Sequence, residues 1–200
     1  MSVESLLAFA LFALVSSITP GPNNTMMLAS GVNFGYRRSV PHLLGICIGL
    51  GLMVVLMGLG LGTLFTLWPM LYTFMRYAGG LYLLYLAWKI FRSAPMESTG
   101  DTTAKPMSFF GAAAFQWVNP KAWVMALTAV TTYLPAGHSV LQLLLIAALF
   151  CTIGAPSVSV WALFGSRMRS YLRNPRTLRI FNSAMALALV ASLYPLFVEV

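Results

Sequence analysis

Long apolar stretches, separated by short polar ones, make up nearly the whole 200-residue chain. Each stretch approaches or exceeds the roughly 20 residues that a helix needs to cross about 30 Å of hydrocarbon. Six stretches can be counted, at residues 5–30, 41–66, 70–91, 108–134, 140–165 and 179–198. The pattern predicts an all-α polytopic membrane protein with six transmembrane helices, and it leaves no room for a soluble domain.

The composition agrees with this prediction. Hydrophobic residues make up 59% of the chain and charged residues only 8%, whereas soluble domains carry about 25% charged residues. A cleaved signal peptide needs a basic segment before its apolar core. The only charged residue before the first apolar stretch is the acidic Glu4, so we expect that stretch to remain as a span.

The basic residues are concentrated in alternate loops. The net charge is +8, and ten of the twelve Lys and Arg residues follow spans 1, 3 and 5. They are Arg37, Arg38, Lys89, Arg92, Lys105, Arg167, Arg169, Arg173, Arg176 and Arg179. The positive-inside rule places these loops in the cytoplasm and both termini outside. The charge therefore sets topology, and we expect a lipid bilayer and no nucleic acid as partner.

Residues 93–107 form the one long polar segment, and they divide the chain into two sets of three spans, 1–92 and 108–200. An odd number of spans in each set gives the two halves opposite orientations in the membrane. Inverted repeats of three helices are a common architecture of secondary transporters. We therefore expect residues 1–200 to form a single transmembrane transporter domain with a cytoplasmic loop in the middle.

The first span is interrupted by the sequence ITPGPNN at residues 18–24. A helix interior disfavours proline by about 3 kcal/mol and glycine by about 1 kcal/mol. The prolines displace the carbonyls of Ser16 and Ile18, so we predict an unwound segment with free carbonyls, after which the helix restarts at Asn23 and Asn24. The candidate site residues here are Thr19, Pro20, Gly21, Pro22, Asn23 and Asn24.

The fourth span is interrupted by QWVNPKAW at residues 116–123. Lys121 lies close to mid-span, where a cation costs at least about 2.5–3.5 kcal/mol. No Asp or Glu lies inside a span to pair with it. It must rest on carbonyls, a bound anion or water, lose its proton, or extend along the helix to the interface. The candidate site residues here are Gln116, Asn119, Pro120 and Lys121.

The two interruptions occupy the first span of each half, with Pro20 and Pro120 lying 100 residues apart. Broken helices at matching positions of two halves are the best sequence indication of a transport site. A simple proline kink is the alternative. Irregular backbone at membrane depth must face protein or a water-filled cavity, so we expect both interruptions to line one cavity.

Other polar or small residues support weaker hypotheses. Cys47 and Cys151 occupy spans 2 and 5, where they are either small buried hydrophobes or a thiol-redox pair. His42 begins span 2 and is either an interfacial residue or a group that titrates near neutral pH. Two cysteines and two histidines in separate places make no metal site. The spacing Gly45-x-x-x-Gly49 indicates close helix packing within the chain or, as a second use, a homodimer surface.

Several motifs together resemble the LysE/RhtB family of amino-acid exporters. They are TPGPNN, NFGYRRS, AGGLYLLYLAWKIFRS and FQWVNPKAW, and their order and spacing fit over nearly the whole chain. The resemblance implies a carrier of the bacterial inner membrane that exports amino acids or derivatives, without enzymatic activity or a cofactor. The Pro-Gly-Pro-Asn-Asn form is most similar to the cysteine and O-acetylserine exporter branch; threonine and homoserine are further candidate substrates.

The resemblance also leads to a mechanistic hypothesis. The substrate carboxylate meets the restarted helix after Pro22, or Lys121, while the free carbonyls near Ser16 and Ile18 accept the substrate ammonium. No nucleotide-binding motif is present, so we expect an ion gradient, most simply of protons, to drive export. Lys121, His42 or the substrate itself would carry the proton. The alternative function is a membrane scaffold or a transmembrane thiol-redox carrier using Cys47 and Cys151.

Overall fold

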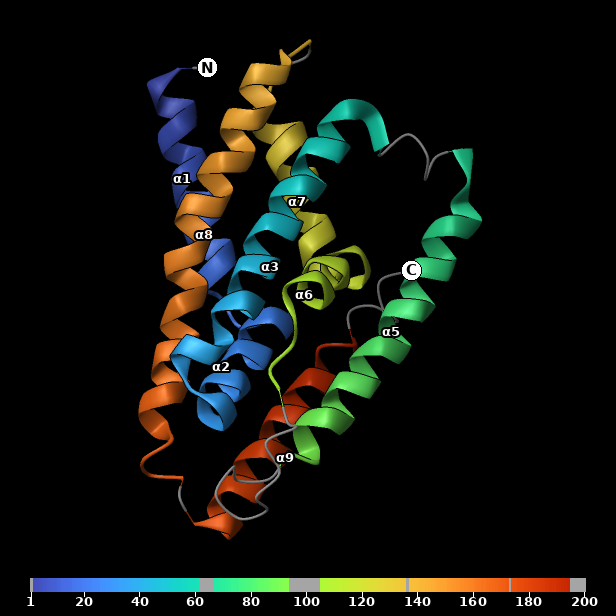
Figure 1. Cartoon of the computed structure of the whole chain (residues 1–200). Helices are drawn as coiled ribbons and strands as arrows, with labels where there is room; N and C mark the ends of the chain where they lie inside the picture. Colours follow the sequence, from blue (N-terminus) through green and yellow to red (C-terminus); the bar gives the residue numbers. More distant parts are fainter. Residues whose placement is uncertain (1, 62–66, 94–104, 136, 173, 195–200) are drawn as a thin grey trace.

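The computed structural model describes residues 2–61, 67–93, 105–135, 137–172 and 174–194 (Figure 1). Every regular element in these ranges is helical, which confirms the all-α prediction. The first half holds α1 (Val3–Ile18), α2 (Pro22–Phe34), α3 (Tyr36–Leu56), η1 (Met57–Leu61) and α5 (Pro69–Phe91). The second half holds α6 (Phe109–Phe115), η2 (Gln116–Val118), α7 (Pro120–Tyr133), α8 (Val140–Met168) and α9 (Pro175–Ala191).

Not every predicted span meets a strict test of length and hydropathy. Within the described residues, Tyr36–Leu61 and Val140–Met168 are each long and apolar enough to cross a membrane. Helices α1 and α2 add a third span if they are taken as one, bent by 55°. The other predicted spans coincide with α5, with the series α6–η2–α7, and with α9. Most of the predicted central loop, residues 94–104, lies outside the described part of the chain.

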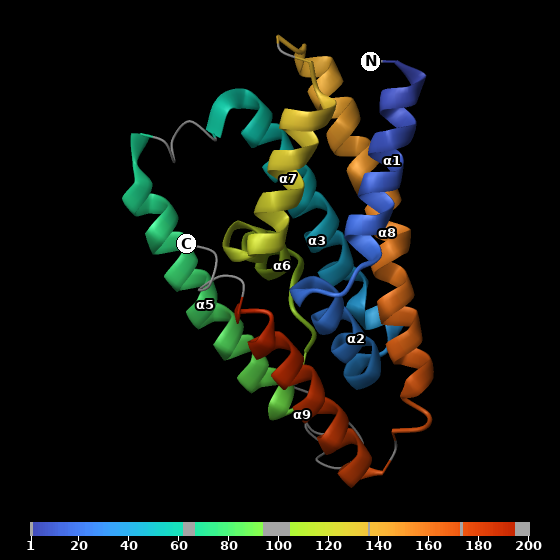
Figure 2. The ribbon, with the colours of Figure 1, turned by 180° about the vertical axis from the view of Figure 1, so that it is seen from behind.

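The helices pack around α3 and α8. Helix α8 contacts α1, α2 and α3, while α3 contacts α6, and α5 pairs with α9. Opposite views show the Pro69 end of α5 standing apart from the other helices (Figures 1 and 2). The largest buried cluster joins α1, α3, α7 and α8, and the ring of Phe9 meets those of Tyr133 and Phe150 edge-on within it.

Close helix contacts depend on glycine. A Cβ on Gly45 would overlap the carbonyl oxygen of Phe109, and a Cβ on Gly49 would overlap the backbone of Ala113. Both neighbours belong to α6, so the predicted packing of these glycines within the chain is confirmed. Both glycines are buried, and a homodimer would therefore need another surface. Helices α2 and α8 approach in the same way at Gly31 and Gly165.

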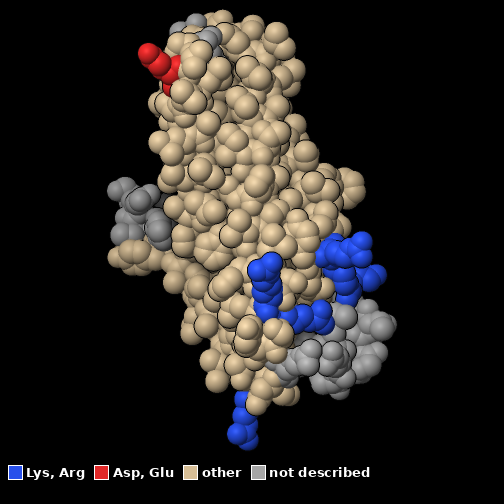
Figure 3. All heavy atoms as spheres, turned by 90° about the vertical axis from the view of Figure 1, so that its left-hand side faces the viewer, with Lys and Arg blue, Asp and Glu red and all other residues tan. Residues whose placement is uncertain are grey.

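Charge is separated along the long axis of the molecule. In the face shown in Figure 3, the blue Lys and Arg side chains gather toward one end and the red acidic side chain lies at the other. Glu4 is the one acidic residue in the described ranges. The gathering of Lys and Arg toward one end is the distribution that the positive-inside rule describes.

Candidate functional site

The predicted interruption of the first span is confirmed. Helix α1 ends at Ile18, and α2 begins at Pro22, one residue before the expected restart. Pro22 occupies the first helical position, where its missing N–H is harmless. Gly21 is extended, with φ of 175°, a conformation that any residue adopts. Its Cβ would lie 2.9 Å from Cδ of Lys121, so a larger residue here would require the flexible lysine stem to shift.

The interruption of the fourth span is also confirmed. Helix α6 passes into the short 3₁₀ segment η2, after which Asn119 takes an extended conformation and α7 begins at Pro120. The side chain of Asn119 caps α7 by accepting a hydrogen bond from the backbone N–H of Lys121 at 3.2 Å. The N-cap residue of α2, Gly21, has no side chain with which to do the same.

The two interruptions touch each other. The side-chain amides of Asn23 and Gln116 exchange two hydrogen bonds, of 2.9 and 3.2 Å. The ammonium of Lys121 donates to the carbonyl and hydroxyl oxygens of Thr19, both at 2.8 Å, and to the carbonyl of Pro20 at 3.3 Å. Lys121 therefore rests on carbonyls, one of the alternatives left by its sequence, and does not extend toward the interface.

One prediction about the unwound segment is wrong. The carbonyls of Ser16 and Ile18 are not free, because the Thr19 hydroxyl donates to Ser16 at 3.1 Å and the indole N–H of Trp161 donates to Ile18 at 3.1 Å. Backbone acceptors away from bulk water rarely stay unpaired, and nearby donors satisfy these two. These two carbonyls are therefore not the unpartnered acceptors that the sequence predicted.

Asn24 holds the unwound segment in shape. Its side chain is 3% exposed, and its Nδ2 donates to the carbonyls of Ser17 and Thr19 at 2.8 and 2.7 Å. Because carbonyls only accept hydrogen bonds, these two contacts fix the orientation of the amide. Its Oδ1 is buried and has no hydrogen-bond partner among the described residues. This oxygen can therefore accept a hydrogen bond from a bound molecule or from water.

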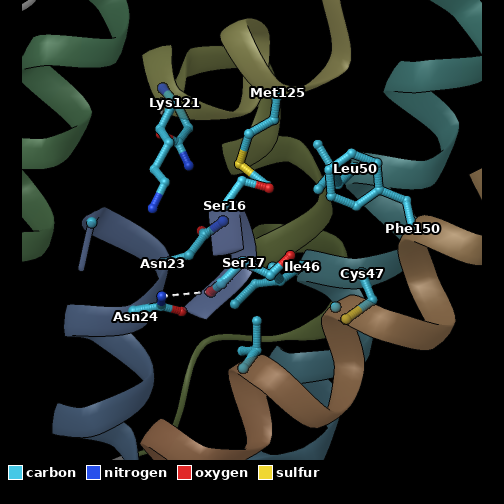
Figure 4. A pocket seen from close by; sticks show the side chains of 14 residues that line it. Ser16, Ser17, Asn23, Asn24, Ile46, Cys47, Leu50, Lys121, Met125 and Phe150 are labelled. Atoms are coloured by element: carbon cyan, nitrogen blue, oxygen red, sulfur yellow. Dashed lines mark hydrogen bonds between the residues drawn. The ribbon is translucent and has the colours of Figure 1, made fainter. Parts of the chain in front are cut away.

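A cavity of about 30 Å³ lies between the two interruptions (Figure 4). The predicted residues that line it are Gly21, Asn23, Asn24, Asn119 and Lys121. Thr19, Pro20 and Gln116 are joined to these residues by hydrogen bonds, while Pro22 and Pro120 begin the two helices. This volume has room for water.

Sequence reasoning missed the apolar wall of this cavity. It comes from α3, α7 and α8 and consists of Ile46, Cys47, Leu50, Met125, Phe150 and Val158. Ser16, Ser17 and Gly154 complete the lining. Ordinary apolar residues of a span carry no local signal that they face a cavity. Trp161, whose indole bonds to the interruption, carried no signal either, because it lies four residues from the end of its predicted span, where membrane tryptophans concentrate.

The two cysteines lie next to each other. The thiol of Cys151 donates to the backbone carbonyl of Cys47 at 3.1 Å, and both thiols are free. His42 is a different case, since it is 2% exposed and neither ring nitrogen has a hydrogen-bond partner among the described residues. It does not line the cavity.

Comparisons with known proteins place the chain among transporters. The family model described as LysE type translocator matches residues 14–192. Over 192 residues the chain is 33% identical to cysteine/O-acetylserine efflux proteins of Escherichia coli (strain K12), Escherichia coli O9:H4 (strain HS) and Shigella sonnei (strain Ss046), an alignment that covers 95% of this chain and 96% of each relative. No solved structure gives a significant match.

Proposed function

We propose, on the premise that the chain belongs to the LysE type translocator family, that it exports a small neutral amino acid or derivative from the cytoplasm. Members of this family are transporters and not enzymes, and the similar proteins are named for efflux of cysteine and O-acetylserine. These two compounds are the first candidate substrates, followed by threonine and homoserine. The proposed location is the bacterial inner membrane.

The observation that carries the proposal is the meeting of the two interrupted helices. Polar backbone within a membrane span persists only where it faces protein or a cavity. Here the two interruptions, far apart in the sequence, share one cavity and bond to each other through Asn23 and Gln116. Broken helices that meet in this way form the substrate sites of many secondary transporters.

The packing pattern supports six spans arranged as two inverted repeats. Spans 1 and 4 are each broken, and each packs on the second span of the other half: α1 and α2 on α8, and α6 and α7 on α3. Two further pairs, α3 with α8 and α5 with α9, join equivalent spans. A two-fold axis in the membrane plane would exchange all of these contacts. Rocking of the halves about the site would then expose it alternately to each side.

The cavity offers distinct surroundings to the two ends of an amino acid. We place the substrate carboxylate near the N-terminus of α2, where unpaired N–H groups and the helix dipole favour an anion, and within reach of Lys121. The side chain then faces the apolar wall that includes Leu50, Met125 and Phe150. Because this wall has no charged group, it favours a small neutral side chain.

Gly154 limits the size of that side chain. An added Cβ would lie 3.4 Å from the hydroxyl oxygen of Ser17, which is ordinary contact, so Gly154→Ala should fold normally while narrowing the cavity. We expect it to reduce export of O-acetylserine more than export of cysteine, by a few-fold in the ratio of the two rates. Competition uptake in inverted vesicles measures this ratio, and an unchanged ratio would show that Gly154 does not limit the size of the substrate side chain.

Proton antiport is the proposed source of energy. Lys121 touches the site directly, and His42 is a buried imidazole on α3 with no hydrogen-bond partner in the described part of the chain. Either group could change protonation as the halves move, since a histidine titrates near neutral pH when its surroundings admit water. No acid from the described residues takes part, because Glu4 lies near the start of α1.

The alternative, a thiol-redox carrier, is favoured by one observation, the contact between Cys151 and Cys47. A disulfide between them would form with loss of two electrons and two protons. Such a carrier requires the redox chemistry of both thiols, whereas an exporter needs from Cys47 only a small side chain in the cavity wall, which serine also supplies. The double variant Cys47→Ser/Cys151→Ser therefore separates the two functions.

The test of the proposed function is uptake of a radiolabelled amino-acid panel into inverted membrane vesicles. The panel contains cysteine, O-acetylserine, threonine, homoserine, leucine, lysine and arginine, each with and without a proton gradient. We expect gradient-dependent uptake of a small neutral member, retained in the double serine variant. Absence of uptake for every member, with the protein inserted, would contradict the proposal, and loss of uptake in the serine variant would favour the redox alternative.

A further inference from the structure

The contact between Lys121 and the first interruption has the form of an ammonium binding site. A primary ammonium has three N–H donors and no acceptor. The Lys121 ammonium meets three oxygens, which are the Thr19 carbonyl, the Thr19 hydroxyl and the Pro20 carbonyl, at 2.8, 2.8 and 3.3 Å. The arrangement comes from two elements that only the fold brings together, α7 and the segment between α1 and α2.

The surroundings favour this arrangement. Gly21 leaves the space through which the lysine stem passes, because a Cβ there would lie 2.9 Å from Cδ and 3.3 Å from Nζ of Lys121. Thr19 and Pro20 are exposed, so an arriving molecule can reach the same oxygens. The buried Oδ1 of Asn24 adds an unpaired acceptor close by, since the amide of the same side chain bonds to Thr19.

The ammonium group of an amino acid has the same donors and the same charge as that of lysine. The Thr19 carbonyl already accepts from both Lys121 and Asn24, which uses its two lone pairs, and two like charges at such short range repel each other. No carboxylate of the described residues lies here to neutralise a second cation, because Glu4 is the one acid in those ranges. A substrate ammonium and the Lys121 ammonium must therefore compete for the site.

We propose that Lys121 is a built-in occupant of the substrate-ammonium subsite formed by Thr19 and Pro20. It fills the subsite when no substrate is bound, and the α-ammonium of the substrate displaces it. The flexible four-carbon stem of lysine then carries the displaced ammonium to the substrate carboxylate. This assignment rests on the proposed function for the identity of the substrate, but the subsite and its occupant can be tested without transport.

The exchange has a consequence for specificity. A substrate must present a primary ammonium able to donate to several carbonyl and hydroxyl oxygens at once. N-acetylated amino acids lack the positive charge, and trimethylated ones lack the N–H donors, so neither displaces Lys121. The apolar wall determines which substrate side chains fit, while the exchange with Lys121 requires a free amino group on the substrate.

The test is chemical replacement of the lysine ammonium by a small free amine. The variant Lys121→Ala, purified in lipid nanodiscs, is heated with increasing ethylammonium chloride, and tetramethylammonium chloride at equal ionic strength serves as the reference salt. We expect ethylammonium to raise the unfolding temperature saturably, by roughly 2–4 °C, and tetramethylammonium to have no such effect. Wild-type protein should respond much less, because Lys121 competes for the subsite and ethylammonium brings no carboxylate to receive a displaced lysine.

Two further variants complete the test. Lys89→Ala removes an exposed lysine whose ammonium lies over the ring of Tyr85, and it should behave as wild type. Gly21→Ala keeps the lysine but crowds its stem, so that the ammonium must shift away from these oxygens, and it should gain the response to ethylammonium even if Lys121→Ala does not fold. A response of equal size in wild type, or none in both Lys121→Ala and Gly21→Ala, would overturn the proposal.

The uptake panel separates this inference from the proposed function. If ethylammonium stabilises Lys121→Ala while the wild-type protein transports no amino acid, the ammonium subsite stands and the proposed function fails. If amino acids are transported but ethylammonium has no effect on either variant, the exporter stands and the role of Lys121 as an occupant is wrong.

Discussion

Replacing Gly31 with alanine is expected to unfold the protein at a temperature lower by roughly 6–12 °C, the effect of about 3 kcal/mol of overpacking. Gly31 lies where α2 crosses α8, and a Cβ there would overlap the carbonyl oxygen of Ala162 and lie 3.0 Å from the backbone nitrogen of Ser166. Both neighbours are backbone atoms of a helix, so no side-chain rotation relieves the overlap. Thermal unfolding of the purified variant measures the change.

The matched control is Gly154→Ala, which makes the same substitution at a position where the new methyl group has room. Its nearest neighbour is a side-chain hydroxyl at ordinary contact distance, 3.4 Å. We expect its unfolding temperature to stay within about a degree or two of wild type. Equal unfolding temperatures for Gly31→Ala and Gly154→Ala would contradict the close packing of α2 on α8.

The substitution Asn24→Leu is expected to lower export at least about tenfold, a change that corresponds to about 1.4 kcal/mol. Leucine has a similar size but cannot donate to the carbonyls of Ser17 and Thr19, which Asn24 reaches at 2.8 and 2.7 Å. A buried acceptor left without a partner costs about 1–3 kcal/mol. The unwound segment should therefore change shape, and the subsite at Thr19 should be lost with it.

The control for this prediction is Asn33→Leu on the same helix. Asn33 is also buried, but it bonds to Ala29 and Asn182, away from the cavity. Both variants should be less stable than wild type, whereas uptake per folded molecule should fall only in Asn24→Leu. Wild-type uptake by Asn24→Leu, normalised to folded protein, would exclude the interruption of the first span as the transport site.

The local breaks in the two spans could be predicted from the sequence because proline and glycine act on their own helix. Pro22 and Pro120 begin α2 and α7. Proline has no backbone N–H, so it favours the first turn of a helix in any surroundings. The polar residues around these prolines remain predicted site residues, and the structure brings several of them together around one cavity. The same reasoning failed for the carbonyls of Ser16 and Ile18. Residue types alone do not show which donors lie beside these carbonyls, and in the fold they are Thr19 and Trp161.

The sequence by itself determined the all-helical architecture, the membrane environment and the positions of both interruptions, because hydropathy and backbone chemistry are local properties. Only the tertiary structure decided that the interruptions touch, that Lys121 bonds to Thr19 and Pro20, and that the wall with Phe150 closes the cavity. These are contacts between helices distant in the chain. Their geometry depends on how closely glycines such as Gly31 and Gly45 allow the helices to approach.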